Sequence, residues 1–199
     1  MPSQLTPDST GGDDPFKQGP RGWLCQTTGE AARSGGSAVP AVTSVGDTFC
    51  WPVRIYWEDT DAGGIVFYAN YLKFFERTRT EWLRSMGVEQ QRLRERTGGM
   101  FVVIETSTRH LRPARLDDEL IVTATLFEMG RASLTIWQKA LLKSEHEKTA
   151  SKDKSTSDSA VKNTGLLCEG RIRIGWVDAA SMRPARIPDS IVSRLRTST

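Results

Sequence analysis

A short stretch of carboxylates and glycines is the part of the chain best suited to chemistry. It spans Glu58–Gly64, carries three acidic side chains and two adjacent glycines, and leads into a helical pattern. Glycine lets a backbone approach a ligand closely, and free N–H groups at a helix start favour a negative oxygen. A neighbouring carboxylate can act as nucleophile or general base. The stretch therefore predicts a site that binds and attacks an acyl carbonyl.

Asp61 is the strongest candidate among these carboxylates, because it directly precedes Ala62-Gly63-Gly64 and the start of the helical pattern. A structural alternative exists for both Asp59 and Asp61. Aspartate side chains commonly bond to backbone N–H groups two residues further on and so stabilise turns. The residues alone leave catalysis and turn formation open.

Histidine-dependent catalysis has few candidate residues, since the chain has only two histidines. His146 lies in a polar, low-complexity segment, and His110 lies in a predicted strand, where a structural or surface role is favoured. Sites of the Ser-His-Asp or Cys-His type are therefore not expected. The chain also lacks an H-E-x-x-H motif, paired cysteines and a carboxylate–histidine cluster, so we expect no metal and no cofactor.

The elements that must position Asp61 follow from hydrophobic periodicity. Residues 49–57 alternate as a strand does. From Tyr68 to Met86, large apolar residues recur at helical spacing, and Gly87 is a plausible stop. A shorter helical turn follows at residues 89–96. Strand-like segments then cover residues 100–112, 119–128, 132–143 and 166–177, and a last helical turn covers residues 187–192.

One long helix followed by a run of strands predicts an α+β fold, in which an antiparallel sheet wraps around a central helix. Residues 1–48 are rich in Gly, Ser, Thr, Pro and Asp and predict a disordered or loosely ordered extension. Residues 49–199 then form the folded domain. Within it, residues 144–165 have almost nothing to bury and predict a hairpin insertion without a chemical role.

Composition narrows the classes of protein. No apolar run approaches the roughly 20 residues that span a bilayer, so stable membrane insertion is not expected. The start of the chain shows no secretory signal, and three cysteines without a CxxC motif favour a reduced, cytoplasmic compartment. The net charge of +3 suits a small anionic ligand or a solvated basic surface. A dense basic stripe with exposed aromatics, typical of nucleic-acid binding, is missing.

Five segments together resemble the hotdog-fold acyl-CoA thioesterases, most closely the YbgC / 4-hydroxybenzoyl-CoA thioesterase family. The matching segments are Glu58–Val66, Tyr68–Tyr71, Phe75–Glu81, Arg112–Leu120 and Arg183–Pro188. The similarity runs from about residue 50 to 195 and omits the insertion.

This resemblance implies a hotdog fold with about five strands, a homo-oligomer (a dimer or a tetramer) with sites at the subunit interface, and hydrolysis of acyl-CoA to free acid and CoA. It implies that Asp61 is the catalytic nucleophile or base and that the backbone N–H of Tyr68 binds the thioester oxygen. It also implies substrate-binding positions at Gly63, Gly64, Val66, Asn70, Tyr71 and Arg131, the last where a basic residue contacts CoA phosphates in one branch.

Tyr68 departs from part of the family, because many YbgC-like members carry histidine there. In this respect the chain looks more like the 4-hydroxybenzoyl-CoA branch. Two other functions stay open. The chain could be a hotdog module that binds acyl thioesters or a protein partner without catalysis. It could also be a hotdog hydratase or dehydratase, although those enzymes usually pair a histidine with a carboxylate, and no histidine neighbours Asp61 in the sequence.

Overall fold

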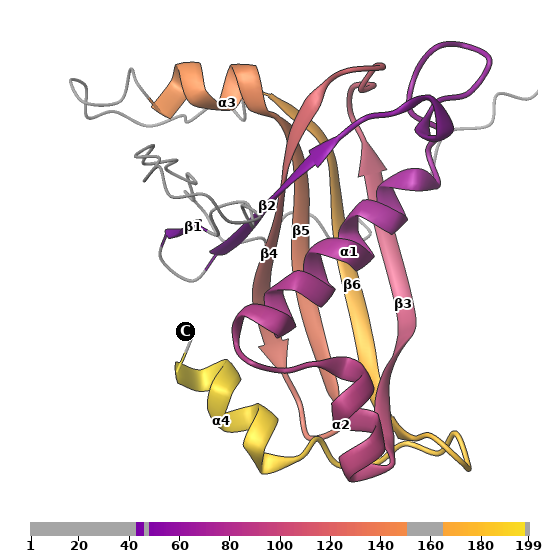
Figure 1. The fold of residues 1–199 in the computed structure, drawn as a ribbon, viewed down its shortest axis with the longest axis vertical. Helices are drawn as coiled ribbons and strands as arrows, with labels where there is room; N and C mark the ends of the chain where they lie inside the picture. Colours follow the sequence, from indigo (N-terminus) through magenta and orange to yellow (C-terminus); the bar gives the residue numbers. More distant parts are fainter. Residues whose placement is uncertain (1–42, 46–47, 151–164, 198–199) are drawn as a thin grey trace, which may run out of the picture.

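An antiparallel sheet wrapped around one long helix dominates the computed structural model, which describes residues 43–45, 48–150 and 165–197 (Figure 1). The strands are β1 (Thr43–Val45), β2 (Thr48–Arg54), β3 (Gly99–His110), β4 (Glu119–Met129), β5 (Ser133–Leu142) and β6 (Leu166–Asp178). The helices are the short 3-10 helix η1 (Trp57–Asp59), then α1 (Asn70–Ser85), α2 (Gln90–Thr97), α3 (Lys143–Ala150) and α4 (Asp189–Thr197).

The strands form one sheet in the order β1-β2-β4-β5-β6-β3, and every neighbouring pair is antiparallel. Helix α1 crosses one face of this sheet, and the strands curve around it (Figure 1). This arrangement confirms the predicted α+β hotdog fold. Strand β3 closes one edge of the described sheet and pairs with β6 alone.

Two boundaries differ from the sequence-based expectation. The five expected strands correspond to β2–β6, and β1 is an additional short strand inside the segment predicted to be loosely ordered. Most of that segment, residues 1–42, lies outside the described residues. The insertion expected at 144–165 begins as helix α3, which follows β5 directly. Residues 151–164 lie outside the described part.

Helix α1 forms because its apolar residues recur at intervals of three and four, which places them on one side. The buried residues that follow this spacing include Tyr71, Phe74, Phe75, Thr78, Trp82 and Leu83. The apolar residues at helical spacing between Tyr68 and Met86 include Leu72, which is therefore expected on this face. In the structure Leu72 is 43% exposed and Phe74 takes its place against the sheet.

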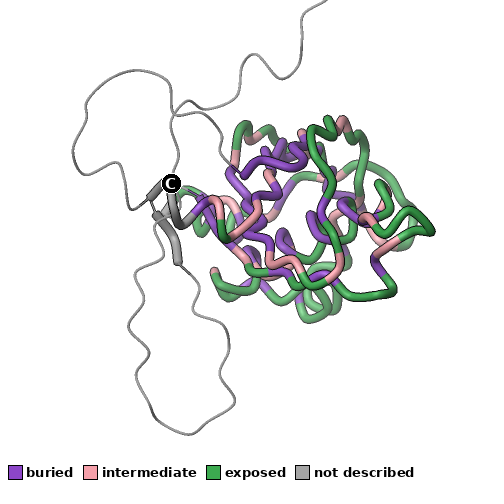
Figure 2. The backbone as a smooth tube through the Cα atoms, turned by 90° about the horizontal axis from the view of Figure 1, so that it is seen from above, coloured by how far each residue is buried: buried purple, intermediate pink, exposed green. Residues whose placement is uncertain are grey.

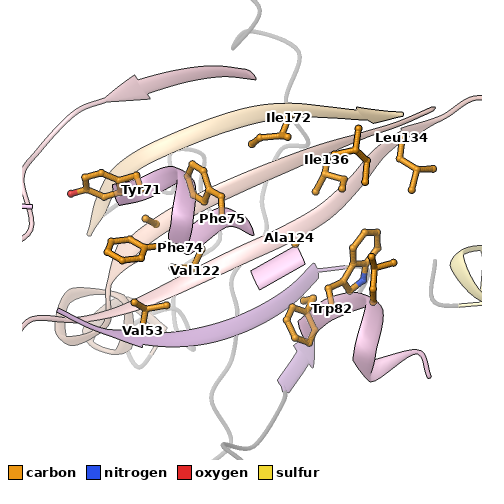
Figure 3. Close-up of a cluster of buried hydrophobic side chains, with 14 of the residues drawn as sticks. Val53, Tyr71, Phe74, Phe75, Trp82, Val122, Ala124, Leu134, Ile136 and Ile172 are labelled. Atoms are coloured by element: carbon orange, nitrogen blue, oxygen red, sulfur yellow. The ribbon is translucent and has the colours of Figure 1, made fainter. Parts of the chain in front are cut away.

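The core lies between α1 and the sheet face that it crosses. Side chains from alternate positions of β4, β5 and β6 point toward the helix, among them Val122, Ile136 and Ile172 (Figure 3). Buried backbone is concentrated in the middle of the molecule and exposed backbone at its rim (Figure 2). Each fully buried aliphatic side chain contributes about 1.5–3 kcal/mol to stability, so this layer fixes where α1 lies.

A polar group sits inside this layer. Gln138 of β5 is fully buried, and its Nε2 donates to the Phe75 carbonyl of α1 at 3.0 Å and to the Thr123 carbonyl of β4 at 3.3 Å. Its Oε1 accepts a bond of 2.7 Å from Arg79 Nη1. The amide therefore links the helix backbone to the centre of the sheet. Buried hydrogen bonds of this kind are directional, so they fix the position of the helix more narrowly than apolar packing does.

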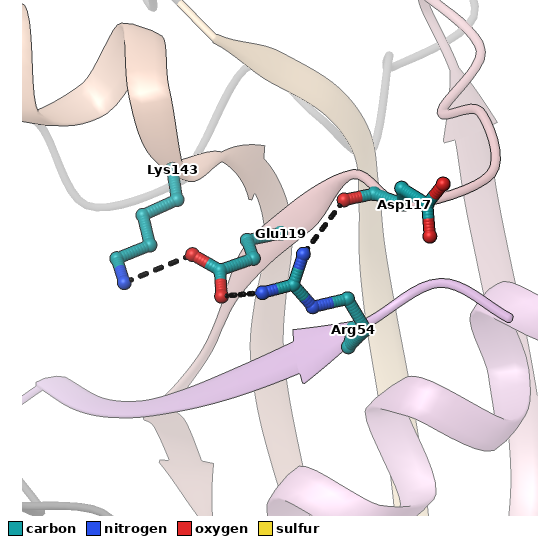
Figure 4. A network of polar contacts seen from close by, with 4 residues as sticks. All are labelled: Arg54, Asp117, Glu119 and Lys143. Atoms are coloured by element: carbon teal, nitrogen blue, oxygen red, sulfur yellow. Dashed lines mark hydrogen bonds and ion pairs between the residues drawn. The ribbon is translucent and has the colours of Figure 1, made fainter.

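The strand ends nearest the start of α1 are tied together by a surface network (Figure 4). Arg54, the last residue of β2, pairs with Glu119 and donates from Nη1 to the Asp117 carbonyl at 3.0 Å. Lys143 reaches Glu119 at 3.1 Å and lowers the pKa of this carboxyl through their hydrogen bond. Exposed pairs contribute little individually, but this network joins β2, β4 and the start of α3 where the loop toward α1 departs.

Gly170 of β6 allows α1 to approach the sheet. A Cβ at this position would lie 2.8 Å from Phe75 Cε2 and 3.0 Å from Ile172 Cδ1. Both neighbours belong to the packed core, in which an extra methyl group forces side chains or backbone to shift.

We therefore expect Gly170→Ala to lower the free energy of unfolding by roughly 1–3 kcal/mol, the usual cost of overpacking. Gly130→Ala is the matched control, because the nearest atoms to its added Cβ lie at 3.5 Å. The control should stay within about 0.5 kcal/mol of the wild type. Urea unfolding measures both, and equal stabilities of the two variants would contradict a tight approach of α1 at Gly170.

Candidate active site

Asp59 organises the loop that leads into α1. Its Oδ2 accepts a hydrogen bond of 3.0 Å from the Tyr56 N–H. Its carbonyl oxygen accepts two more bonds, each of 2.9 Å, from the Phe67 N–H and from Asn70 Nδ2. Asp59 is also buried. These contacts give Asp59 a structural role and set it apart from Asp61.

Asp61 forms the turn expected of an aspartate beside glycines. Its Oδ1 accepts a bond of 2.8 Å from the Gly63 N–H, and its carbonyl accepts one of 3.0 Å from the Gly64 N–H. Gly64 has φ +70°, a left-handed conformation that other residues adopt only with strain. The side chain of Asp61 is exposed, and its Oδ2 bonds to nothing in the described chain. The predicted Asx-turn is therefore present, and one carboxylate oxygen is still available.

The start of α1 is open. Ala69 is the N-cap residue and supplies no side-chain hydrogen bond, and the first turn of α1 contains no acidic residue. Within the described ranges, the backbone N–H groups of Tyr68 and Ala69 have no acceptor. Such groups carry the partial positive charge of the helix end. This end is therefore suited to bind a negative oxygen.

A pocket of about 250 Å³ lies beside this helix start. Val66, Tyr68, Tyr71, His110 and Arg112 are among the residues that line it. The predicted positions Val66, Tyr68 and Tyr71 are thus brought together. The Asp61–Gly64 turn does not line the pocket, but Ile65, which does, follows that turn directly.

Two polar side chains of the pocket are already engaged. The Tyr71 hydroxyl accepts a bond of 3.1 Å from the Ala114 N–H, and burial raises the pKa of this phenol. Arg112 donates to Glu145 of α3 at 2.9 Å and to the Leu166 carbonyl at 3.4 Å. Both residues therefore shape the wall of the pocket, and Tyr71 presents its ring to it.

His110 is the residue that the sequence interpretation missed. It ends β3, lines the pocket, and its ring meets the rings of Tyr71 and Tyr68 edge-on at centroid distances of 5.3 and 6.3 Å. Partial desolvation lowers its pKa. The sequence favoured a structural or surface histidine at this position, and the structure adds that His110 lines the pocket beside Tyr68 and Tyr71. Only the three-dimensional arrangement of β3 and α1 brings His110 to the site.

Two further predicted positions lie away from the pocket. Asn70 is buried and its Nδ2 bonds to the Asp59 carbonyl, so it anchors the helix start. Arg131 lies in the β4–β5 turn, at the opposite end of the sheet from the start of α1 (Figure 1). There it lines a separate pocket of about 350 Å³ with Arg186 and Arg196. One chain thus does not bring Arg131 to Tyr68.

The described residues contain no group of three His, Cys, Asp or Glu side chains placed to hold a metal ion. They also contain no helix long and apolar enough to cross a membrane.

The known proteins that this chain resembles are described as thioesterases. The thioesterase superfamily matches residues 63–147. The acyl-CoA thioester hydrolase YbgC of Escherichia coli O6:H1 is 38% identical over 149 residues, which cover 74% of this chain and 96% of that protein. The acyl-CoA thioesterase YbgC of Haemophilus influenzae is 34% identical over 143 residues, covering 72% and 90%. The crystal structure of a probable thioesterase from Bartonella henselae has a TM-score of 0.57 and 26% identity, covering 71% and 99%.

Replacement of Asp59 should lower the free energy of unfolding more than replacement of Asp61. Asp59→Ala removes the acceptor of the Tyr56 N–H and should lower the free energy of unfolding by roughly 1–3 kcal/mol. Asp61→Asn keeps an oxygen for the Gly63 N–H and should stay within about 0.5 kcal/mol of the wild type. Urea unfolding of both variants tests this assignment, which fails if Asp61→Asn is the more destabilised of the two.

Proposed function

We propose that this chain, which belongs to the thioesterase superfamily and within it to the YbgC acyl-CoA thioesterases, hydrolyses acyl-CoA to the free acid and CoA. Its two curated YbgC relatives carry that activity in their names and match most of its length. The observation that carries the proposal is the open start of α1, where the Tyr68 N–H faces no internal acceptor next to the turn of Asp61.

The thioester carbonyl would bind with its oxygen at the Tyr68 N–H. The backbone, not the side chain, supplies this contact, so tyrosine in place of the histidine of many relatives does not remove it. Negative charge develops on the carbonyl oxygen in the transition state, and the helix end is already oriented toward it. One such donor is typically worth about 10²–10³ in rate.

Asp61 would supply the second element of catalysis. Its free carboxylate oxygen either attacks the carbonyl carbon and forms a mixed anhydride, or accepts a proton from an attacking water. General base catalysis contributes about 10²–10⁴ in rate. The Asx-turn with Gly63 N–H fixes one oxygen of the carboxylate and so orients the other. Gly63 and Gly64 would then act by shaping this turn. The reaction as proposed requires neither a metal nor a cofactor.

One observation favours a second candidate, a hotdog hydratase or dehydratase. Such enzymes rely on a histidine with a carboxylate, and His110 does lie beside Tyr68. Hydration of an enoyl thioester, assayed alongside hydrolysis, separates the two activities. The hydrolase is preferred because the curated relatives are thioester hydrolases.

The exposed edge of the sheet supports the proposal of a homo-oligomer. Strand β3 is long and pairs on one side only within the described sheet, and Val103 and Ile104 are more than half exposed there. A long apolar edge strand is a template for pairing with another chain. A second copy paired antiparallel there would bring its β4–β5 turn, with Arg131, toward the end of β3 that lies near Tyr68. A cytoplasmic location remains a prediction from the sequence.

Replacement of the catalytic carboxylate tests the proposed activity. Asp61→Asn should lower kcat/KM for the best acyl-CoA by roughly 10²–10⁴, because it removes the nucleophile or base. Asp178→Asn is the matched control. Asp178 Oδ1 also accepts a backbone bond in a turn, from Ser181 N–H at 2.8 Å, and it lies at the far end of the β3–β6 ladder.

A thiol-release assay with short, long and aryl acyl-CoAs measures both variants. The control should retain wild-type activity. Wild-type activity of Asp61→Asn would remove Asp61 from the mechanism, and tight acyl-CoA binding by the wild type without turnover would favour a binding module.

A charge on the sheet edge should disturb assembly. We expect Val103→Lys to shift the protein toward monomers in size-exclusion chromatography with light scattering, because lysine on an edge strand opposes pairing. Met182→Lys changes another apolar residue that is more than half exposed, but lies outside the strands, and should leave the mass unchanged. A monomeric wild type would contradict the proposal.

A further inference from the structure

We propose that His110 is a second catalytic residue of this site and accepts the proton of the hydrolytic water. The inference rests on the proposed thioesterase function and deepens it, because it divides the work of nucleophile and base between two residues. Asp61 then attacks the thioester, and His110 serves the second half of the reaction.

The position of His110 carries the inference. Its ring and the ring of Tyr68 line the same pocket and meet edge-on with centroids 6.3 Å apart. The Tyr68 N–H is the proposed donor to the carbonyl oxygen, and Tyr68 and His110 line the same pocket. The two residues come from different elements: β3 delivers His110, and the loop before α1 delivers Tyr68. A water entering this open pocket can approach both.

The imidazole is also available. In the described part of the chain it makes no hydrogen bond and no ion pair, so both ring nitrogens can meet substrate or water. Two other polar side chains of the pocket are engaged. The Tyr71 hydroxyl accepts from the Ala114 N–H, and Arg112 is paired with Glu145.

The charged and titratable groups around His110 leave it in the basic form. From β6, its strand partner Cys168 is buried with a pKa raised to about 12, so this thiol stays neutral. From α1, burial raises the pKa of Tyr71, which also stays neutral. Arg112 of the following loop carries a charge balanced by Glu145 of α3. Desolvation lowers the pKa of His110, which favours the neutral, basic form of the imidazole.

The complete reaction balances with these groups. In the first half, an Asp61 oxygen bonds to the carbonyl carbon, the carbon–sulfur bond breaks, and the thiolate of CoA leaves. In the second half, water attacks the acyl carbon of the anhydride, His110 accepts one water proton, and the Asp61 carboxylate leaves. The imidazolium then returns its proton to the thiolate or to solvent. The sum is thioester plus water giving acid plus thiol.

The test is the pH profile of hydrolysis by full-length His110→Gln, with the acyl-CoA that the wild type cleaves best. The variant should lose roughly 10²–10⁴ in kcat, the usual contribution of a general base. KM should fall in parallel and kcat/KM should change little, because the first half of the reaction does not use His110. In the wild type, kcat should fall as the pH falls through the lowered pKa of His110. This acid limb should be missing from the variant. His146→Gln replaces the only other histidine, on α3, and should keep both rate and profile.

Chemical rescue distinguishes a base from a wall residue. Free imidazole should restore part of the activity of His110→Ala and none of that of Asp61→Asn. The inference is overturned if His110→Gln keeps the wild-type kcat and acid limb, or if imidazole fails to rescue a folded His110→Ala. Failure of the proposed function looks different, because the wild type would then leave every acyl-CoA intact.

Discussion

The carbonyl oxygen of Asp59 is the contact on which the candidate site depends. It accepts two donors at 2.9 Å, the Phe67 N–H and Asn70 Nδ2, and so closes the loop between β2 and α1. Closure at this point has a consequence for the helix. The side chain of Asn70 bonds to the loop and does not cap α1. The N–H groups of Tyr68 and Ala69 are left without an acceptor in the described structure.

An open helix end is useful only if it is held still, and the buried polar group under α1 supplies that constraint. Gln138 bonds to the backbone of both α1 and β4, and Arg79 bonds to Gln138. Burial lowers the pKa of Arg79 to about 10, so its guanidinium stays charged at neutral pH. A buried cation is costly to leave without a partner. Any shift of α1 that broke this bond would therefore be resisted more strongly than a shift within the apolar layer.

Sequence patterns predicted the main strands and helix α1, but not which side chains from different elements come into contact. Strands β2–β6 and helix α1 follow from alternation and from spacing by three and four, which are local properties. The sequence favours Asp61 over Asp59 only through its place before the glycines. It does not show that the Asp59 side chain accepts the Tyr56 N–H while that of Asp61 is exposed. His110 gives no local signal at all. Its approach to Tyr68 depends on the length and register of β3 against β6, which no short window contains. Arg131 shows the converse, since a family pattern named it but the fold places it at the other end of the sheet.

The separation of Arg131 from Tyr68 can be estimated from the length of α1. Helix α1 has 16 residues and is about 24 Å long, so the β4–β5 turn lies roughly a helix length from Tyr68. Within one subunit, the pocket therefore has to work with its own electrostatics. Burial raises the pKa of the acids Tyr71 and Cys168 and lowers the pKa of the base His110, so it favours the neutral form of all three. The guanidinium in the pocket wall, Arg112, is paired with Glu145. The charges that we assign to catalysis are therefore the positive helix end and the carboxylate of Asp61 in the preceding loop. A carbonyl placed between them is polarised along the direction in which an attacking carboxylate and a departing thiolate require it.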